Sequence, residues 1–275
     1  MFSSNLNIGA NRDRELLHSA ETFCYKETEH GPLLIHVYDD KLDDSPEKPT
    51  ILFFHGGFCD VPAITQFATQ ALHFMKLGFI CLLAETRVSS KHQSSPVDSA
   101  EDAKELIIGL KKNAEQFGID REKIILVGAA GGAFLALQAA MQKINTKDQA
   151  PHPVPAAVIA LSAIVNTCPG SDYARKFPNS STAKRHSPSK LIRKKLPPML
   201  FLHGKNDRIA PLAEVISFRR WMRWKRNRCE VVEYEAADHR FFNFNMNQVL
   251  HDVAIKDMEI FLRQLGFIPN KDHDI

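Results

Sequence analysis

The chain has 275 residues, of which 44% are hydrophobic, so it can bury the core of one large α/β domain. Its formal net charge of +3 is too small to indicate nucleic acid as a partner. No apolar run approaches the roughly 18 residues that a membrane-spanning helix needs, which excludes a membrane span.

The five cysteines are odd in number, widely spaced and without a Cys-x-x-Cys pair. This spacing predicts neither a disulfide framework nor a metal site, and it is typical of free thiols in a reducing compartment. Residues 1–9 lack the basic segment and apolar run of a signal peptide. We therefore expect a cytoplasmic protein, and no Gly/Ser-rich or Pro-rich linker divides residues 1–275 into two domains.

The first half of the chain predicts alternating strands and helices. The alternating residues 33–38 predict a strand, and the apolar runs 50–55 and 79–84 predict strands that are covered on both faces. A helix is expected over 62–77. The clearest helix is expected over 99–117, with Asp98 and Glu101 as its capping pair.

Residues 123–134 combine a short apolar strand, a glycine-dense turn and the start of a small-residue helix that should run to about residue 143. The layout is typical of the Gly-x-Ser-x-Gly nucleophile elbow, in which the central residue sits on a strained strand-to-helix turn. Gly128 and Gly132 occupy the two glycine positions, but the central residue is Ala130. An ordinary strand-to-helix turn that binds a phosphate or nothing is the alternative.

The second half continues the alternation around one polar interruption. A connection is expected at 149–155, strands at 156–161, 198–203 and 229–234, and helices at 211–226 and 246–265. The polar, Lys/Arg-rich residues 165–195 fit a lid-like insertion or a disordered excursion. The order predicts an α/β fold with a mostly parallel central sheet and helices on both faces.

Open parallel sheets place their sites beyond the carboxyl ends of the strands. These ends carry His55-Gly-Gly-Phe58, the turn at 128–132, His203-Gly-Lys-Asn-Asp207 and Ala236-Ala-Asp-His239. An acid and then a histidine therefore follow the elbow in chain order, which is the order of α/β-hydrolases.

Residues 22–266 resemble the esterase/lipase branch of the α/β-hydrolase superfamily, particularly its carbohydrate-acetyl or feruloyl esterase-like members. The resemblance rests on these motifs together with Asp120 and Ser187-Pro188. The resemblance implies that Ala130 stands where the nucleophilic serine would be, with His239 as general base and Asp207 as the acid that orients it. It also implies an oxyanion hole from the amide of Gly131 and an amide of Gly57 or Phe58. His55 is expected to hold the Gly-Gly loop rather than to act chemically.

Alanine cannot form an acyl-enzyme, so the chain as written should be nearly inactive. Either it is a natural non-catalytic relative, or it is an esterase whose serine was replaced. The retained Asp207, His239 and Gly-Gly loop, and the strain of alanine at positive φ, favour a recent or deliberate change.

Neither Cys59 nor Ser162 lies on a strand-to-helix turn, so we expect both to pack or cap rather than to replace the nucleophile. Met222, Trp221 and Trp224 are expected in the core or on a helix face. The basic segments 184–195 and 219–228 are expected to be a mobile lid and a solvated helix face, with attraction of an anionic partner as the alternative.

The function predicted from the sequence is that of a serine carboxylesterase on small acyl or carbohydrate esters, needing no metal or organic cofactor. A non-catalytic protein that binds a small ligand or a partner is the alternative, and amide hydrolysis by the same machinery stays open. A small-molecule ester is the expected partner, and a homo-oligomer stays open.

Overall fold

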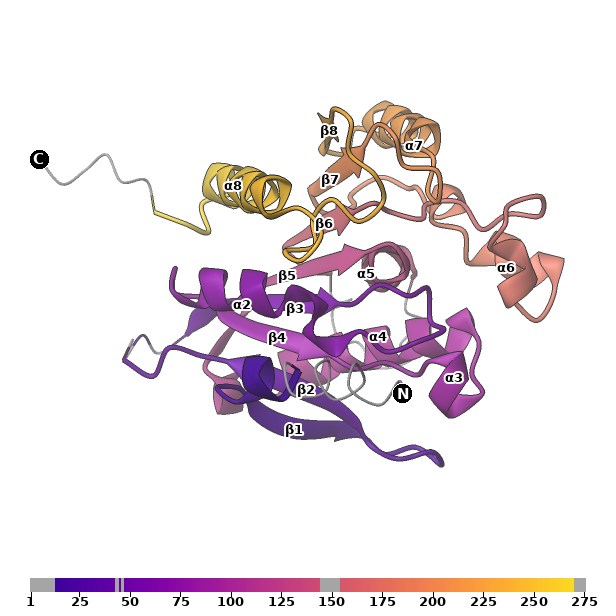
Figure 1. Cartoon of the computed structure of the whole chain (residues 1–275). Helices are drawn as coiled ribbons and strands as arrows, with labels where there is room; N and C mark the ends of the chain where they lie inside the picture. The colour runs from indigo at the N-terminus through magenta and orange to yellow at the C-terminus, as the bar shows by residue number, and fades with distance from the viewer. Residues whose placement is uncertain (1–12, 43–44, 46, 144–153, 270–275) are drawn as a thin grey trace, which may run out of the picture.

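The computed structural model describes residues 13–42, 45, 47–143 and 154–269. Its centre is an eight-stranded sheet in the order β1-β2-β4-β3-β5-β6-β7-β8 (Figure 1). The strands are β1 (Glu21–Lys26), β2 (Leu33–Tyr38), β3 (Lys48–Phe54), β4 (Ile80–Ala84), β5 (Ile119–Ala129), β6 (Ala157–Leu161), β7 (Met199–Gly204) and β8 (Cys229–Tyr234). Strand β2 runs antiparallel to both neighbours and the remaining pairs are parallel, so the sheet is mostly parallel, as predicted.

Helices cover both faces of this sheet. The long ones are α2 (Ala68–Met75), α4 (Pro96–Lys112), α5 (Gly131–Met141), α7 (Leu212–Trp224) and α8 (Gln248–Gln264). Alternate residues of β3 enter two separate apolar clusters, because side chains alternate along a strand. Leu52 and Phe54 pack with α4, α5 and α7, whereas Ile51 and Phe53 pack with α2 and α8.

The predicted strands lie within two residues of the observed ones, except that β5 is longer than the expected 124–127. Strand β1 was missed because it is a short edge strand with no buried residue, in which only Phe23 and Tyr25 pack against the core. The helix expected over 62–77 is a 3₁₀ turn, η1 (Ile64–Phe67), followed by α2. The connection expected at 149–155 lies mostly outside the described residues.

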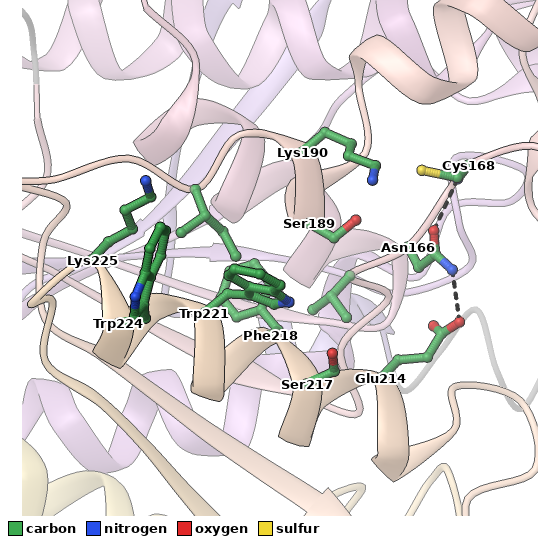
Figure 2. A pocket seen from close by; sticks show the side chains of 12 residues that line it. Asn166, Cys168, Ser189, Lys190, Glu214, Ser217, Phe218, Trp221, Trp224 and Lys225 are labelled. Atoms are coloured by element: carbon green, nitrogen blue, oxygen red, sulfur yellow. Dashed lines mark hydrogen bonds between the residues drawn. The ribbon is translucent and has the colours of Figure 1, made fainter.

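Helix α7 places its side chains in two environments. Met222 is fully buried, whereas Trp221 and Trp224 are 53% and 66% exposed. The two indoles stand beside a surface hollow between α7 and residues 165–192, as Figure 2 shows. The expectation of core and helix-face positions is therefore confirmed, with the tryptophans on the exposed face.

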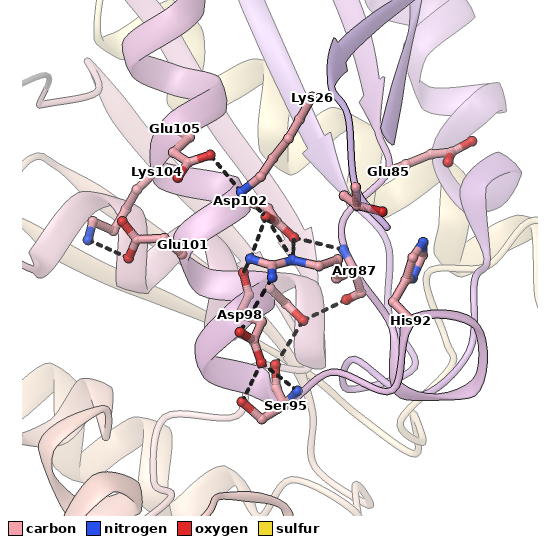
Figure 3. Close-up of polar contacts among 12 residues, drawn as sticks. Lys26, Glu85, Arg87, His92, Ser95, Asp98, Glu101, Asp102, Lys104 and Glu105 are labelled. Carbon is pink, nitrogen blue, oxygen red and sulfur yellow. Dashed lines mark hydrogen bonds and ion pairs between the residues drawn. The ribbon is translucent and has the colours of Figure 1, made fainter. Parts of the chain in front are cut away.

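The predicted capping pair of Asp98 and Glu101 was wrong. Helix α4 begins three residues earlier, at Pro96, with Ser95 as its N-cap and Asp98 as the third helical residue of the capping box. The carboxylate of Asp98 accepts a 2.8 Å hydrogen bond from the Ser95 amide (Figure 3). Proline at the first helical position fixes this start, because its missing amide is not needed there.

Residues 165–195 form an ordered, partly buried segment rather than a disordered excursion. It contains the short helices η3 (Ala174–Lys176), α6 (Ser180–Arg185) and η4 (Pro188–Lys190). The Thr167 hydroxyl donates to the Ala183 carbonyl at 2.8 Å, and the Thr167 amide donates to the Ser187 hydroxyl at 3.0 Å. Buried hydrogen bonds of this kind hold the two ends of the segment together.

Candidate active site

The turn between β5 and α5 has the geometry of a strained elbow. Ala130 has φ 48° and ψ −108°, and Gly131 begins the helix immediately after it. The Ala130 amide donates to the Leu161 carbonyl of neighbouring β6 at 2.9 Å. A non-glycine residue at this positive φ is costly unless the surroundings fix it, and such residues cluster at functional sites.

The two glycines of the elbow are required by close backbone approach. A Cβ atom on Gly128 would overlap the Gly132 carbonyl, and a Cβ atom on Gly132 would overlap the Phe54 carbonyl at the end of β3. Backbone atoms cannot move aside as a flexible side chain does. The glycines therefore let α5 start directly against the sheet.

We expect Gly132→Ala to lower the free energy of unfolding by about 3 kcal/mol or more, because the added methyl group overlaps backbone. The measurement is urea unfolding followed by circular dichroism. Gly109→Ala in α4 is the matched control, because a Cβ atom there meets nothing within 4 Å. That control should be stabilised by about 0.5–1 kcal/mol. Equal stabilities for the two variants would contradict the close approach.

The loop after β3 lies against the elbow. The ring of His55 hydrogen-bonds through Nδ1 to the Gly56 carbonyl at 2.8 Å, and the Gly56 amide donates to Gln66 Oε1 at 2.6 Å. A Cβ atom on Gly131 would lie 2.5 Å from the Phe58 amide nitrogen. The Phe58 amide therefore adjoins Gly131, and the role of His55 in holding the loop stays a prediction.

Strain in the same loop turns its backbone toward the elbow. Gly57, Phe58 and Cys59 all have positive φ, at 90°, 41° and 61°. Two successive non-glycine residues in this region are uncommon. Strained backbone of this kind persists only where the surrounding structure fixes it, and it clusters at functional sites.

Asp207 and His239 form a hydrogen-bonded pair beyond β7 and β8. Nδ1 of His239 lies 2.8 Å from Oδ2 of Asp207. Oδ1 of the same carboxylate accepts from the amides of Ile209 and Ala210, at 2.9 and 2.8 Å. The carboxylate thus holds the imidazole with Nε2 left for an incoming group. The elbow follows β5 and this acid follows β7, with only β6 between them in the sheet.

His203, at the end of β7, is a second histidine on this carboxylate that the sequence analysis did not single out. Its Nε2 is 2.7 Å from the Ala210 carbonyl and 3.3 Å from Oδ2 of Asp207, and its side chain is fully buried. Burial alone would raise the pKa of Asp207, but hydrogen bonds from His203, His239 and the Ala210 amide lower it well below the usual range. The only sequence signal was the i, i+4 spacing of His203 and Asp207 across a turn.

Because its pKa is lowered on folding, Asp207 should contribute stability that is complete above about pH 4, the unfolded pKa of an aspartate, and is lost as the pH falls toward the lower folded pKa. We expect Asp207→Asn to be less stable than the parent at pH 7, with the difference shrinking below about pH 4. Urea unfolding of both proteins at several pH values between 7 and 3 measures this. A pH-independent difference would mean that the carboxylate is not selectively stabilised in its charged form.

The two other candidate nucleophiles are buried. Burial raises the pKa of the Cys59 thiol to about 12, although a hydrogen bond with Ser99 lowers it. The Ser162 hydroxyl makes no hydrogen bond within the described residues, and its side chain is inaccessible. Among the described residues, no hydrogen bond joins either group to a histidine or a carboxylate, so both fit packing roles.

The 165–195 segment reaches over the site through Tyr173. The Tyr173 ring lies 4.6 Å from that of Phe58, and its hydroxyl donates to the Ile209 carbonyl at 2.8 Å. The segment thus contacts both the loop after β3 and the loop that carries Asp207. Such contacts are consistent with a lid, and this role stays a prediction.

Within the described ranges, no group of three or more His, Cys, Asp or Glu side chains could hold a metal ion. Likewise, none of the helices in this part of the chain is long and apolar enough to cross a membrane.

The fold and the sequence are both similar to those of esterases. A structure of esterase 2 from Thermogutta terrifontis, a thermophilic esterase, is 27% identical with a TM-score of 0.85, covering 94% of this chain and 96% of that one. A structure of the same esterase phosphoramylated by tabun is 28% identical with the same TM-score, covering 93% of this chain and 98% of that one.

Esterase LipC of Mycobacterium tuberculosis is 25% identical over 232 residues, which cover 76% of this chain. The match spans only 57% of that relative's length. The family model described as BD-FAE matches residues 35–176, more than half of the chain. The chain belongs to the BD-FAE family and has the α/β-hydrolase fold of these esterases.

Proposed function

We propose that this chain carries the machinery of a serine carboxylesterase for small acyl or carbohydrate esters, disabled by alanine at the nucleophile position. One observation carries the proposal. Ala130 occupies a positive-φ elbow between β5 and α5, while the Asp207–His239 pair at 2.8 Å is intact. An elbow without a nucleophile, in a chain that keeps a hydrogen-bonded Asp–His pair at neighbouring strand ends, is difficult to explain by packing alone.

With serine at position 130, each group has a defined task. Nε2 of His239 takes the proton from the serine hydroxyl as it attacks the ester carbonyl, and Asp207 stabilises the imidazolium that forms. The amides of Gly131 and Phe58 donate to the developing oxyanion, because they adjoin each other at the helix start. His239 then protonates the leaving alcohol and activates the water that releases the acid.

With alanine in place, no acyl-enzyme forms and only binding and oxyanion stabilisation remain. Hydrolysis of p-nitrophenyl acetate by the protein and by its Ala130→Ser variant, measured side by side, tests the proposal. A folded serine variant without activity on a broad panel of esters would overturn it.

Alanine at the elbow also favours a second candidate, a non-catalytic hydrolase-like protein that binds a small ligand or a partner. In this case the site binds its ligand without turnover. A ligand that binds tightly and stays unhydrolysed after Ala130→Ser would support this candidate over the esterase.

A further inference from the structure

Positive charge is concentrated in one part of the chain. Residues 180–228 hold 14 of the 35 Lys and Arg residues but only two of the 32 Asp and Glu residues, Asp207 and Glu214. The other residues comprise 21 basic and 30 acidic ones. The net charge of +3 therefore conceals a strongly basic region on an otherwise acidic protein.

This basic region forms a continuous hollowed surface. Three adjoining hollows of about 590, 450 and 320 Å³ lie along it. Lys190 lines both the first and the second, and Lys225 lines both the first and the third. We call this surface the basic groove. The cations that line it are Lys143, Arg185, Lys190, Arg193, Lys194, Lys195, Lys225, Arg226 and Arg228. Within the described residues, Arg228 pairs with Glu230 at 2.7 Å, and no ion pair joins any of the other eight cations to a carboxylate.

Two exposed aromatic rings lie in the first hollow of the basic groove. The rings of Trp221 and Trp224 are 5.5 Å apart and nearly perpendicular, at 87°. The Lys225 ammonium lies 4.1 Å from the centroid of the Trp224 ring. Large exposed apolar surfaces on a protein commonly mark an interaction site.

Fixed polar groups face the same hollow (Figure 2). The Asn166 amide nitrogen donates to Glu214 at 2.9 Å, and its oxygen accepts from the Cys168 amide at 3.1 Å. The hydroxyls of Ser189 and Ser217 also line the hollow. An apolar platform with a few convergent polar groups in a hollow of this volume is typical of a ligand site.

We propose that the basic groove binds an anionic polysaccharide, a chain of sugars that carry carboxylate groups. The C–H face of a pyranose ring packs on an indole and removes apolar area from water. Its hydroxyls hydrogen-bond to Asn166, Glu214 and the serines, and its carboxylates pair with the unpaired cations along the groove. This surface contains none of the residues of the elbow or of the Asp207–His239 pair, so the proposal does not depend on esterase activity.

Single-stranded nucleic acid also combines aromatic stacking with a basic groove. Two features favour the sugar chain. The perpendicular indoles do not offer parallel faces to successive bases. Moreover, the Glu214 carboxylate in the first hollow accepts hydrogen bonds, and each ring of a sugar chain carries several hydroxyl groups that can donate them.

The test measures binding of the full chain to oligogalacturonate by isothermal titration calorimetry. Neutral dextran oligomers and an oligothymidylate of about 20 nucleotides, long enough to occupy a single-strand binding site, are the comparison probes. We expect oligogalacturonate to bind, more weakly as salt rises, and dextran not to bind. Trp221→Ala with Trp224→Ala should weaken binding at least about tenfold, as should Lys190→Gln with Lys225→Gln. The matched control is Lys76→Gln with Lys112→Gln, two exposed lysines outside the groove, which should bind as the parent does.

Circular dichroism checks that each variant is folded. If the control pair weakened binding as much as the groove pairs do, the proposal would be overturned, because binding would then reflect the overall charge of the protein. Absence of oligogalacturonate binding would also overturn it, as would oligothymidylate binding that is tighter and lost in the same tryptophan variants.

Discussion

Replacing Ala130 by serine is expected to raise the rate of p-nitrophenyl acetate hydrolysis by about 10⁴- to 10⁶-fold, because removal of the nucleophile from a Ser-His-Asp hydrolase costs about that much. The backbone at position 130 is already held at φ 48° by the β5–α5 turn, and its amide is fixed to Leu161. Serine adds only a hydroxyl to this backbone, so little rearrangement is needed. Steady-state kinetics of both proteins gives the ratio.

Two further measurements make this prediction specific. Ala130→Gly, which relieves the positive-φ strain without adding a nucleophile, should stay as inactive as the parent. With the serine variant, pre-steady-state kinetics should show a burst of about one p-nitrophenol per chain, and mass spectrometry should show the acyl adduct on residue 130. A rate gain without an acyl adduct would place the chemistry elsewhere.

In the Ala130→Ser background, His239→Ala should return the rate to nearly that of the parent, a loss of about 10⁴-fold or more, because serine without its base is a weak nucleophile. The loss should appear in kcat rather than KM, since the imidazole acts on the reacting atoms. The physical basis is the 2.8 Å hydrogen bond that His239 Nδ1 donates to the Asp207 carboxylate, which fixes the ring with Nε2 directed elsewhere. Kinetics of the double variant on the same ester measures it.

His30→Ala is the matched control. His30 is exposed and lies between β1 and β2, at the opposite edge of the sheet from β8, which His239 follows. It should leave kcat unchanged. If His239→Ala retained the activity of the serine variant, another group would be the base and the proposed role of the Asp207–His239 pair would be wrong.

The order of the strands and helices could be predicted from the chain itself. Buried parallel strands read as continuous apolar runs, and glycines or prolines end the helices, so β2, β3, β4, β6, β7 and β8 were all predicted. Edge strand β1 was missed for the converse reason, since none of its residues is buried. The cap of α4 was misplaced by three residues, because Ser95-Pro96 and Asp98 both carry capping signals and only the backbone shows which begins the helix.

The candidate site likewise has features that could be predicted from the sequence and features that could not. Local motifs were enough to identify the glycine turn, the alanine at its centre, and the candidates Asp207 and His239, because each lies in a short motif at a strand end. The folded structure was needed to show that Phe58 adjoins Gly131, that His203 shares the Asp207 carboxylate, and that basic residues from both 184–195 and 219–228 line one groove. The physical reason is that helix and strand periodicity depends on residues that are close together in the sequence. These contacts instead join segments that are far apart in the sequence and that the order of strands in the sheet brings together.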